Sequence, residues 1–175
     1  MKKKKKTENY IVSFDTFMLQ PVIKDNQVST QVIERNGVVH VPRKPLHIVK
    51  KSCEYYAGSF QNSTNNAKLV IGKRHKLPII VAHDFGVPYI FLPTMSPSAD
   101  QNTWISHNAI ENIEEHDLGS VILLENGQSF VLNVSATTMH RQHSFATILE
   151  KIFLKKQRQL NRLSPFRGND DPDEG

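Results

Sequence analysis

The sequence predicts one α+β domain, built mainly of antiparallel strands, with a short central helix and a longer C-terminal helix. Two Asn-Gly pairs, Asn36-Gly37 and Asn126-Gly127, each lie between β-prone runs. Asn-Gly is the strongest short hairpin signal, because both residues tolerate a positive φ. Apolar residues recur at helical spacing in two further segments, one starting near residue 45 and one near residue 138. A length of 175 residues suits one domain with tails.

The N-terminal third is predicted to consist of an arm and strands. Residues 1–9 contain five consecutive lysines and are expected to form a flexible basic arm. Tyr10–Phe14 alternates enough to predict a first strand, and Phe17–Pro21 is also expected to lie in a strand. The first Asn-Gly pair then joins two predicted strands, Val28–Glu34 and Val38–Val41.

The central helix is predicted within Arg43–Phe60. Pro45 suits the first helical position, where its missing N–H costs nothing, and Gly58 suits a helix C-cap. One side of this helix forms an apolar stripe of Leu46, Val49, Cys53 and Tyr56. The other side is mainly basic and carries His47, Lys50, Lys51 and Glu54. A surface helix with a solvated charged side explains this pattern as well as a binding helix does.

The middle of the chain is predicted to hold short strands separated by loops. Gln61–Asn66 is polar and rich in turn-forming residues, which predicts a loop. Prolines bracket a series of β-prone runs and suit strand ends; the runs are Lys68–Ile71, Ile79–Ala82 and Tyr89–Leu92. A loop over Met95–Asn102 is expected to precede extended segments at Trp104–Ser106 and Ala109–Glu114, with a short helix over Asn108–His116 as the alternative to the second.

The last third is predicted to contain the second hairpin and the long helix. Ser120–Glu125 and Gln128–Val134 are its expected strands, and the helix is expected over Thr138–Leu163, capped by Thr137 or Thr138. Its predicted core stripe is Phe145, Ile148, Leu149 and Ile152. Ser164-Pro165 ends the helix, and the acidic end has nothing to form a core. The expected organisation is therefore a basic arm at 1–9, one domain at 10–163 and a disordered acidic tail at 164–175.

Positive charge is the main functional signal. The chain has a formal charge of +5 although its last eight residues hold four acids and no base, so the preceding residues carry +9. A basic body favours a polyanionic partner, nucleic acid first and an anionic membrane surface second. The cations form clusters at Arg43–Lys51, Lys73–Lys76 and Lys151–Arg167. The residues expected to contact DNA are Arg43, Lys44, Lys50, Lys51, Lys73, Arg74, His75, Lys76, Arg141, Lys155 and Arg158.

Catalytic and metal-binding patterns are weak. Asp84-Phe85-Gly86 occurs in protein kinases, but the glycine-rich loop, strand lysine and catalytic loop of a kinase are missing, so the motif predicts a turn between two strands. His140 and His143 can share one face of a helix, yet no further metal ligand can be nominated. We therefore expect no catalytic residues, metal or cofactor.

Membrane and secretion signals are also lacking. No apolar run approaches the length of a membrane span, and polar residues follow the lysines where a signal peptide would be apolar. The single cysteine, Cys53, cannot form an intrachain disulfide, which fits a reducing cytoplasm. We expect a cytoplasmic, nucleoid-associated protein with no membrane partner.

Several blocks resemble the ComK family of competence transcription factors of Gram-positive bacteria. They run in order from about Gln31 to Ser135, and both ends of the chain are less similar. The quoted blocks are Lys44–Val49 with Ser52-Cys53 and Gly58–Phe60, then His75–Val81, Ile90–Thr94, Trp104–His107 and the Glu125–Gln128 hairpin.

The resemblance implies a sequence-specific activator of DNA-uptake genes. Such proteins recognise paired AT-rich boxes in double-stranded DNA, largely from the minor groove, as homo-oligomers such as dimers or tetramers acting with RNA polymerase. The family is also delivered to a Clp protease by the MecA adaptor. The C-terminal Phe-Met-Leu-Tyr-Pro segment that contributes to this delivery is absent here, and the similar Phe17–Pro21 string lies near the start.

Other function classes remain open on the residues alone. A metal-dependent nucleic-acid-processing enzyme could use His83, Asp84 and His107, although no complete catalytic set is recognisable. A basic interaction module could bind an acidic protein through the same cations. His75–Pro78 could be a groove-entering loop or the start of a strand, whereas Trp104 is expected to be structural.

Overall fold

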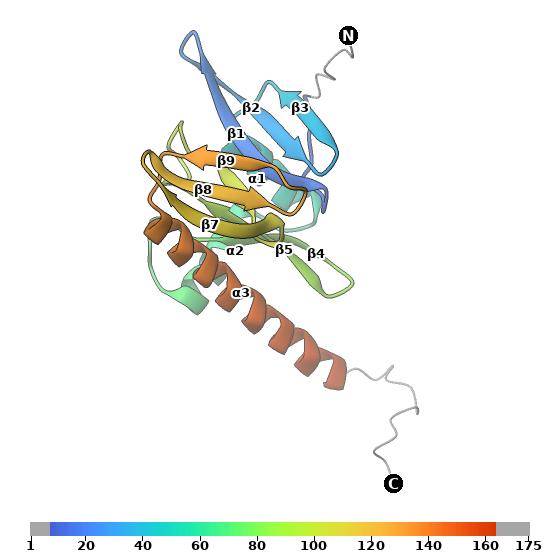
Figure 1. The fold of residues 1–175 in the computed structure, drawn as a ribbon. Coiled ribbons are helices and arrows are strands. Elements are labelled where there is room, and N and C mark those ends of the chain that lie inside the picture. Colours follow the sequence, from blue (N-terminus) through green and yellow to red (C-terminus); the bar gives the residue numbers. More distant parts are fainter. Residues whose placement is uncertain (1–7, 164–175) are drawn as a thin grey trace.

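A six-stranded antiparallel sheet forms the centre of the fold in the computed structural model, which describes residues 8–163 (Figure 1). Its strand order is β3-β2-β1-β6-β5-β4, so the N-terminal strands and the middle strands meet at the short β6. The bounds are β1 (Thr16–Lys24), β2 (Gln27–Glu34), β3 (Gly37–Val41), β4 (Ile79–Asp84), β5 (Val87–Pro93) and β6 (Trp104–Ser106).

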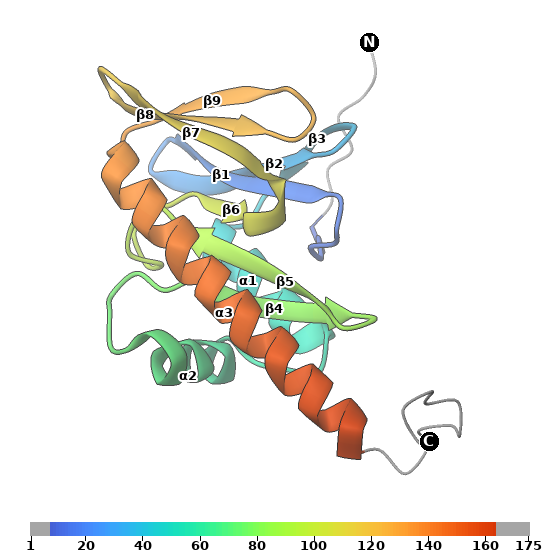
Figure 2. The same cartoon turned by 60° about the horizontal axis from the view of Figure 1, so that its bottom comes forward.

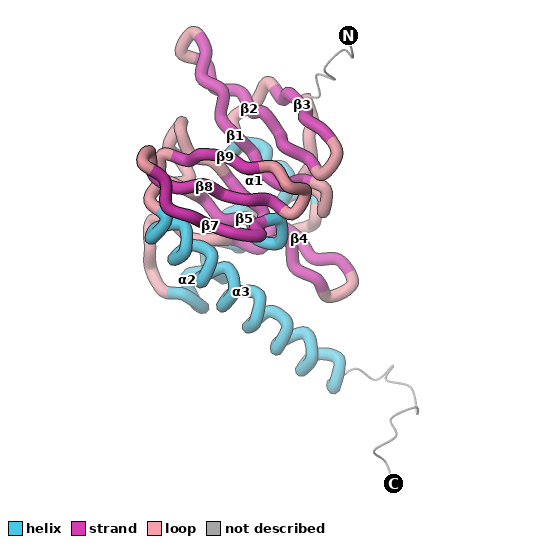
Figure 3. The backbone as a smooth tube through the Cα atoms, in the orientation of Figure 1, coloured by secondary structure: helices cyan, strands magenta, loops and turns pink. Residues whose placement is uncertain are grey.

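A second antiparallel sheet has three strands in sequential order (Figure 3). It consists of β7 (Ile110–His116), β8 (Gly119–Leu124) and β9 (Ser129–Leu132), and a short 3-10 turn at His107–Ala109 precedes it. The helices are α1 (Pro45–Tyr55), α2 (Phe60–Ile71) and α3 (Ala136–Leu163). This is the predicted α+β fold, with a short central helix and a long C-terminal one.

The large sheet is covered on both faces. Successive residues of a strand point to opposite faces, so neighbours such as Met18 and Leu19 belong to different core clusters. Ile105 shares its cluster with Met139 and Leu149 of α3, whereas Trp104 shares the other with residues of α1. Helix α3 and the small sheet therefore cover one face and α1 covers the other (Figure 2). Trp104 is fully buried, which confirms its predicted structural role.

Both Asn-Gly hairpins are confirmed. At the first pair, Glu34 of β2 pairs with Gly37, the first residue of β3, so Arg35-Asn36 form the connection. Gly127, with a φ of 86°, lies in the loop between β8 and β9. The predicted strands at Ile79–Ala82 and Tyr89–Leu92, the loop at Met95–Asn102 and the strand at Trp104–Ser106 also form.

The predicted first strand at Tyr10–Phe14 is wrong. These residues pair with no strand, because side chains of α1 and the residue following it satisfy their backbone instead. The Val12 N–H donates to Ser52 Oγ at 3.1 Å, and the Val12 carbonyl accepts from the Tyr56 hydroxyl at 2.7 Å. The segment is thus held against α1 outside both sheets.

The predicted loop at Gln61–Asn66 and strand at Lys68–Ile71 are also wrong, since both lie in α2. Asn and Ser favour turns, but here local side-chain bonds stabilise the helix. Ser59 Oγ caps it by accepting from the Asn62 N–H at 3.1 Å, and Gln61 bonds to Asn65 one turn later. Ala67 is buried in the core next to α3, and this tertiary contact outweighs the weak local propensity.

Three details of the predicted helices also differ. The left-handed residue after α1 is Ala57, with a φ of 66°, and Gly58 follows it by bonding to the Cys53 carbonyl. The N-cap of α3 is Ser135, whose Oγ accepts from the Thr138 N–H at 3.2 Å. In the apolar core stripe predicted for this last helix, Leu149 is buried, but Ile148 is 46% exposed.

The predicted arm at 1–9 and tail at 164–175 fall largely outside the described residues, so the domain boundaries stay a prediction. Among the described residues, no helix has the length and apolar character that crossing a bilayer requires.

Candidate nucleic-acid interface

Five of the eleven predicted DNA-contacting residues meet where the loop between α2 and β4 lies against the first half of α3. The loop starts at Gly72, which has a φ of 106° and would be strained as any other residue. Lys73, Arg74 and His75 are exposed, Lys76 is half-buried, and Leu77 enters the core behind them. The buried leucine fixes the depth of the loop, so its cations face outward.

A cavity of about 320 Å³ separates this loop from α3. Its α3 wall is made of Arg141, Gln142 and Phe145. The four loop residues Lys73–Lys76 form the remaining wall, so the cavity brings together cations that are distant in sequence. We call Lys73, Arg74, His75, Lys76 and Arg141 the cavity cluster.

Two contacts fix the geometry of the cavity cluster. Gln142 is 2% exposed and its Nε2 donates to the Lys76 carbonyl oxygen at 3.2 Å, which ties the loop to α3. The guanidinium carbon of Arg74 lies 4.7 Å from the ring centre of Phe145, a cation–π arrangement that orients the Arg74 side chain. Gln142 Oε1 is buried without a hydrogen-bond partner among the described atoms.

The charge of the cavity cluster is uncompensated. Lys73, Arg74, Lys76 and Arg141 are lysines and arginines, and the cavity is lined by no acidic residue. Over residues 8–163, none of these side chains has a carboxylate within ion-pair distance. Cations held together without acids repel one another, and a phosphate placed among them removes that repulsion.

Four further cations of α3 extend this positive surface along the helix. Lys151, Lys155, Arg158 and Arg162 recur at spacings that place them on one exposed side of α3. We call these four the α3 stripe. Arg158 is seventeen positions from Arg141, which corresponds to about 25 Å of helix. Of the predicted contacts, Lys155 and Arg158 lie in this stripe.

The α1 cations lie elsewhere. Arg43, Lys44, Lys50 and Lys51 are exposed, but α1 covers the opposite face of the large sheet from α3. Two are paired with acids at 3.4 Å, Lys44 with Asp100 and Lys51 with Glu54. Burial, followed by repulsion from Arg43 and Lys51, lowers the pKa of His47. The fold therefore separates the predicted DNA contacts into two surfaces.

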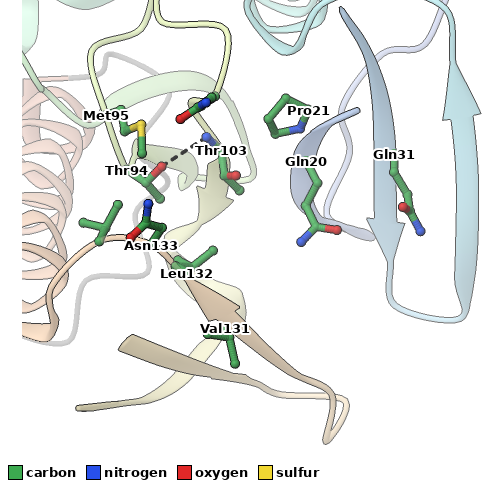
Figure 4. A pocket seen from close by; sticks show the side chains of 11 residues that line it. Gln20, Pro21, Gln31, Thr94, Met95, Thr103, Val131, Leu132 and Asn133 are labelled. Carbon is green, nitrogen blue, oxygen red and sulfur yellow. Dashed lines mark hydrogen bonds between the residues drawn. The ribbon is translucent and has the colours of Figure 1, made fainter. Parts of the chain in front are cut away.

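Two other cavities lack this character. One of about 290 Å³ lies beside β1, β2 and β9 and is lined by amides and apolar groups such as Gln20, Gln31 and Asn133 (Figure 4). No charged side chain lines it. A larger one of about 540 Å³ between residues 8–11 and α1 contains Glu8 and Glu54 beside Lys51, so its charges largely cancel.

The residues of the enzyme hypothesis do not form one site. His83 packs at a tilt against Phe153 of α3, with ring centres 5.4 Å apart, and Asp84 follows it at the end of β4. His107 instead bonds to Thr147 at 3.1 Å and lies 4.6 Å from the His143 ring. Within the described part of the chain, no three His, Cys, Asp or Glu side chains are grouped to hold a metal.

Sequence reasoning missed Gln142. The signal was available: Met139, Gln142, Ala146 and Leu149 recur at spacings of three and four, so a glutamine lies on the apolar side of a helix. A polar residue at such a position requires a partner, which here is the Lys76 carbonyl.

Comparison with known proteins identifies the family. The family model described as ComK protein matches residues 7–158. A curated relative, the competence transcription factor of Bacillus subtilis (strain 168), is 28% identical over 136 residues, which cover 77% of this chain and 70% of the relative. No solved structure matches the chain.

Proposed function

This chain belongs to the ComK family, and from that premise we propose that it is a competence transcription factor that binds double-stranded DNA through the cavity cluster and the α3 stripe. The named relative is a transcription factor rather than an enzyme, which supports the same class here. In this proposal the protein needs no catalytic group and no cofactor.

The uncompensated cavity cluster is the observation that carries the proposal. Four lysine and arginine side chains line one cavity that no acidic residue lines, and α3 continues the positive surface for about 25 Å. Duplex DNA carries one charge per roughly 1.7 Å of axis, so a surface of this length spans many phosphates. An acidic protein partner would satisfy the same charges, and sequence selectivity for duplexes separates the two.

We further propose that the preferred targets are paired AT-rich boxes approached largely from the minor groove. AT-rich minor grooves are narrow and have an enhanced negative potential, which attracts Arg and Lys side chains. The exposed Arg74 and Arg141 are the candidates for this role. Paired boxes require a symmetric oligomer, a dimer or tetramer, whose spacing matches the helical turn of DNA.

Fluorescence anisotropy tests the proposal with labelled duplexes that carry paired A-tract and T-tract boxes or a scrambled sequence. We expect preference for the boxes and steep weakening with salt. Arg74→Ala with Arg141→Ala should reduce the salt slope by about two, because each lost cation leaves roughly one more counterion on the DNA. Lys24→Ala and Lys68→Ala, which remove exposed cations outside both surfaces, are the matched controls. Binding indifferent to sequence and salt would overturn the proposal.

The α1 cations define a second arm of the experiment. Lys50 and Lys51 remain proposed DNA contacts, although Lys51 is paired with Glu54 and Lys50 lies 5.7 Å from the Phe60 ring centre. If DNA reaches both surfaces, Lys50→Ala with Lys51→Ala lowers the salt slope as the cavity variants do. If the α1 cations face solvent and do not contact DNA, this double variant leaves the salt slope unchanged while the cavity variants still lower it.

Protein partners follow from the same proposal. A transcription factor of this kind acts with RNA polymerase at the nucleoid. Control by the MecA adaptor and a Clp protease is proposed without a binding segment, since the Phe17–Pro21 string lies in β1, where Phe17, Met18 and Leu19 are buried. Degradation of the purified protein by the reconstituted adaptor and protease tests this point.

A further inference from the structure

Phe85 occupies the tip of the hairpin between β4 and β5 and is 99% exposed. The last paired residues are Asp84 and Val87, so the connection contains only Phe85 and Gly86. Both have a positive φ, 48° and 76°. This is the type I′ arrangement, for which Asn or Asp is the favoured first residue.

The same chain contains a second two-residue hairpin, whose turn residues are of the types that favour this conformation. Asp25 and Asn26 connect β1 to β2 in a two-residue turn with φ values of 52° and 60°. A bulky aromatic residue in the left-handed region is strained, at a free-energy cost that Asp and Asn largely avoid. At 99% exposure, contacts within residues 8–163 cannot offset that cost for Phe85. A strained and fully exposed aromatic residue therefore indicates a contact outside the chain.

The hairpin is held rigidly from both sides. On one side, His83 packs at a tilt against Phe153 of α3 with ring centres 5.4 Å apart. On the other side, Tyr89 packs edge-on against Phe14 and Tyr56. The tip extends past the rest of the sheet, toward the same side of the molecule as the C-terminal half of α3 (Figure 2). These aromatic contacts hold the hairpin, and with it the exposed ring, in a fixed position relative to α3.

The neighbouring charges favour nucleic acid as the partner. Phe153, which contacts His83, lies between Lys151 and Lys155 in sequence but on the opposite side of α3, since residues two apart on a helix do not share a face. The exposed Lys156 lines the same small cavity as Phe153, and α3 carries five cations and no acid from residue 151 to residue 162. Asp84 is the acid nearest in sequence to the tip. Burial raises the pKa of Tyr56 and of Tyr89, and the charge of the nearby Asp84 adds to both shifts, so this acid faces tyrosines rather than the open tip.

We propose that Phe85 is a wedge that inserts between stacked base pairs while exposed cations of the C-terminal half of α3 contact the DNA backbone. This inference rests on the proposed DNA binding and adds to it the group that bends the duplex. Apolar side chains that enter a base step from the minor groove unstack it and kink the duplex by 20–90° in proteins that bend DNA. A phenylalanine held at a rigid tip beside a basic helix has the chemistry for that insertion.

Two variants separate the wedge from a folding effect. Phe85→Asn gives the turn a favoured residue, so the melting temperature should stay the same or rise. DNA bending, measured by energy transfer between dyes at the duplex ends, should be lost, and affinity for the boxes should fall at least tenfold. Phe85→Leu keeps an apolar wedge and should retain most of the bend. Leu69→Ala, which removes an 87% exposed side chain on α2, is the matched control and should change neither.

A direct readout is 2-aminopurine placed at successive steps of a box, because its fluorescence rises when a neighbouring base is unstacked. The wild-type protein should increase the 2-aminopurine fluorescence at one base step, and the Phe85→Asn variant should increase it at none. The slope of affinity against salt should be the same for both proteins, because the wedge makes no phosphate contact.

The outcomes distinguish the two proposals. If the wild-type protein does not bind duplex DNA, the proposed function itself fails. If the wild type binds and bends DNA and the Phe85→Asn variant does so equally well, the proposal that Phe85 inserts between base pairs is wrong, and the proposed DNA binding is retained. If Phe85→Asn changes the sedimentation of the free protein, the tip contacts a second copy instead, and the wedge is again overturned.

Discussion

Gln142 in α3 donates a hydrogen bond of 3.2 Å to the backbone carbonyl of Lys76, 66 residues earlier in the chain. This bond is the point at which the core of the protein and the cavity cluster meet, because Gln142 is buried while the loop cations are exposed. The positions of the cations therefore depend on a residue that carries no charge.

Replacing Gln142 by leucine tests this dependence. The substitution removes the bond to Lys76 but also removes the Oε1 atom that is buried without a partner, and these effects on stability oppose each other. We expect the free energy of unfolding to change by less than about 1 kcal/mol while DNA affinity falls severalfold. Urea unfolding and anisotropy measure the two quantities. Equal affinity at equal stability would show that the loop holds its position without this bond.

Ala57→Gly should stabilise the protein. Ala57 follows α1 with a φ of 66°, a conformation that glycine adopts without the steric cost of a Cβ. The gain is reduced because glycine also increases the freedom of the unfolded chain, so we expect a net stabilisation of about 0.5 kcal/mol. Thermal unfolding checks the sign. Gly58→Ala is the matched comparison, since Gly58 has ordinary dihedral angles and its added Cβ would lie 3.5 Å from the Cys53 carbonyl.

Gly119→Ala should be strongly destabilising. Gly119 has a φ of 145°, and an added Cβ would lie 2.7 Å from the Val134 amide nitrogen and closer still to the Leu132 carbonyl oxygen. Because both neighbours are backbone atoms, β8 and the end of β9 must move apart, at a cost of about 2–4 kcal/mol. Gly127→Ala, where φ is 86° but the space is open, should cost only about 1 kcal/mol. Urea unfolding of both variants gives the comparison, and equal costs would contradict it.

The protein should lose stability below about pH 6.5. Burial, and then the nearby His143, lowers the pKa of His107, while Glu150, 3.2 Å from Nδ1, acts in the opposite direction. Burial lowers the pKa of His143 as well. Below the ordinary histidine pKa of about 6.5 the unfolded chain therefore binds protons that the folded protein does not. The free energy of unfolding then falls with pH until the folded-state pKa is passed.

Urea unfolding at pH 7.5 and 5.5 measures this loss. His107→Asn removes one of the depressed groups, so its stability should differ less between the two pH values than that of the wild type. His116→Asn, which changes an exposed histidine in β7, is the control and should keep the wild-type difference. A wild-type stability that rises at pH 5.5 would contradict the assignment.

Local patterns predicted what local chemistry decides. The hairpins at Asn36-Gly37 and Asn126-Gly127, the proline start of α1 and the buried role of Trp104 were all readable from the sequence. Helix α2 was not, because Gln61–Asn66 has the composition of a loop and becomes helical through the Ser59 cap and the burial of Ala67. Tyr10–Phe14 failed for a related reason, as its partners are Ser52 and Tyr56, some 40 residues away in sequence.

The candidate site shows the same limit. Its cations were recognisable as clusters, but the sequence could not show that Lys73–Lys76 and Arg141 share a cavity while the α1 cations lie across the sheet. That division depends on which face of the sheet each helix covers. The sequence indicated that Phe85 lies in a turn, but only the fold shows that its ring is fully exposed to solvent.

Helix α3 combines two sets of positions that can change independently. Ala146 and Leu149 are buried against the sheet, whereas the cations of the α3 stripe are exposed and lack carboxylate partners over residues 8–163. Exchanging Lys and Gln on the outer side leaves the packed side intact, so under the proposed function the affinity for DNA can be strengthened or weakened in small steps while the melting temperature stays nearly constant. A regulator built this way is tunable in strength without being rebuilt.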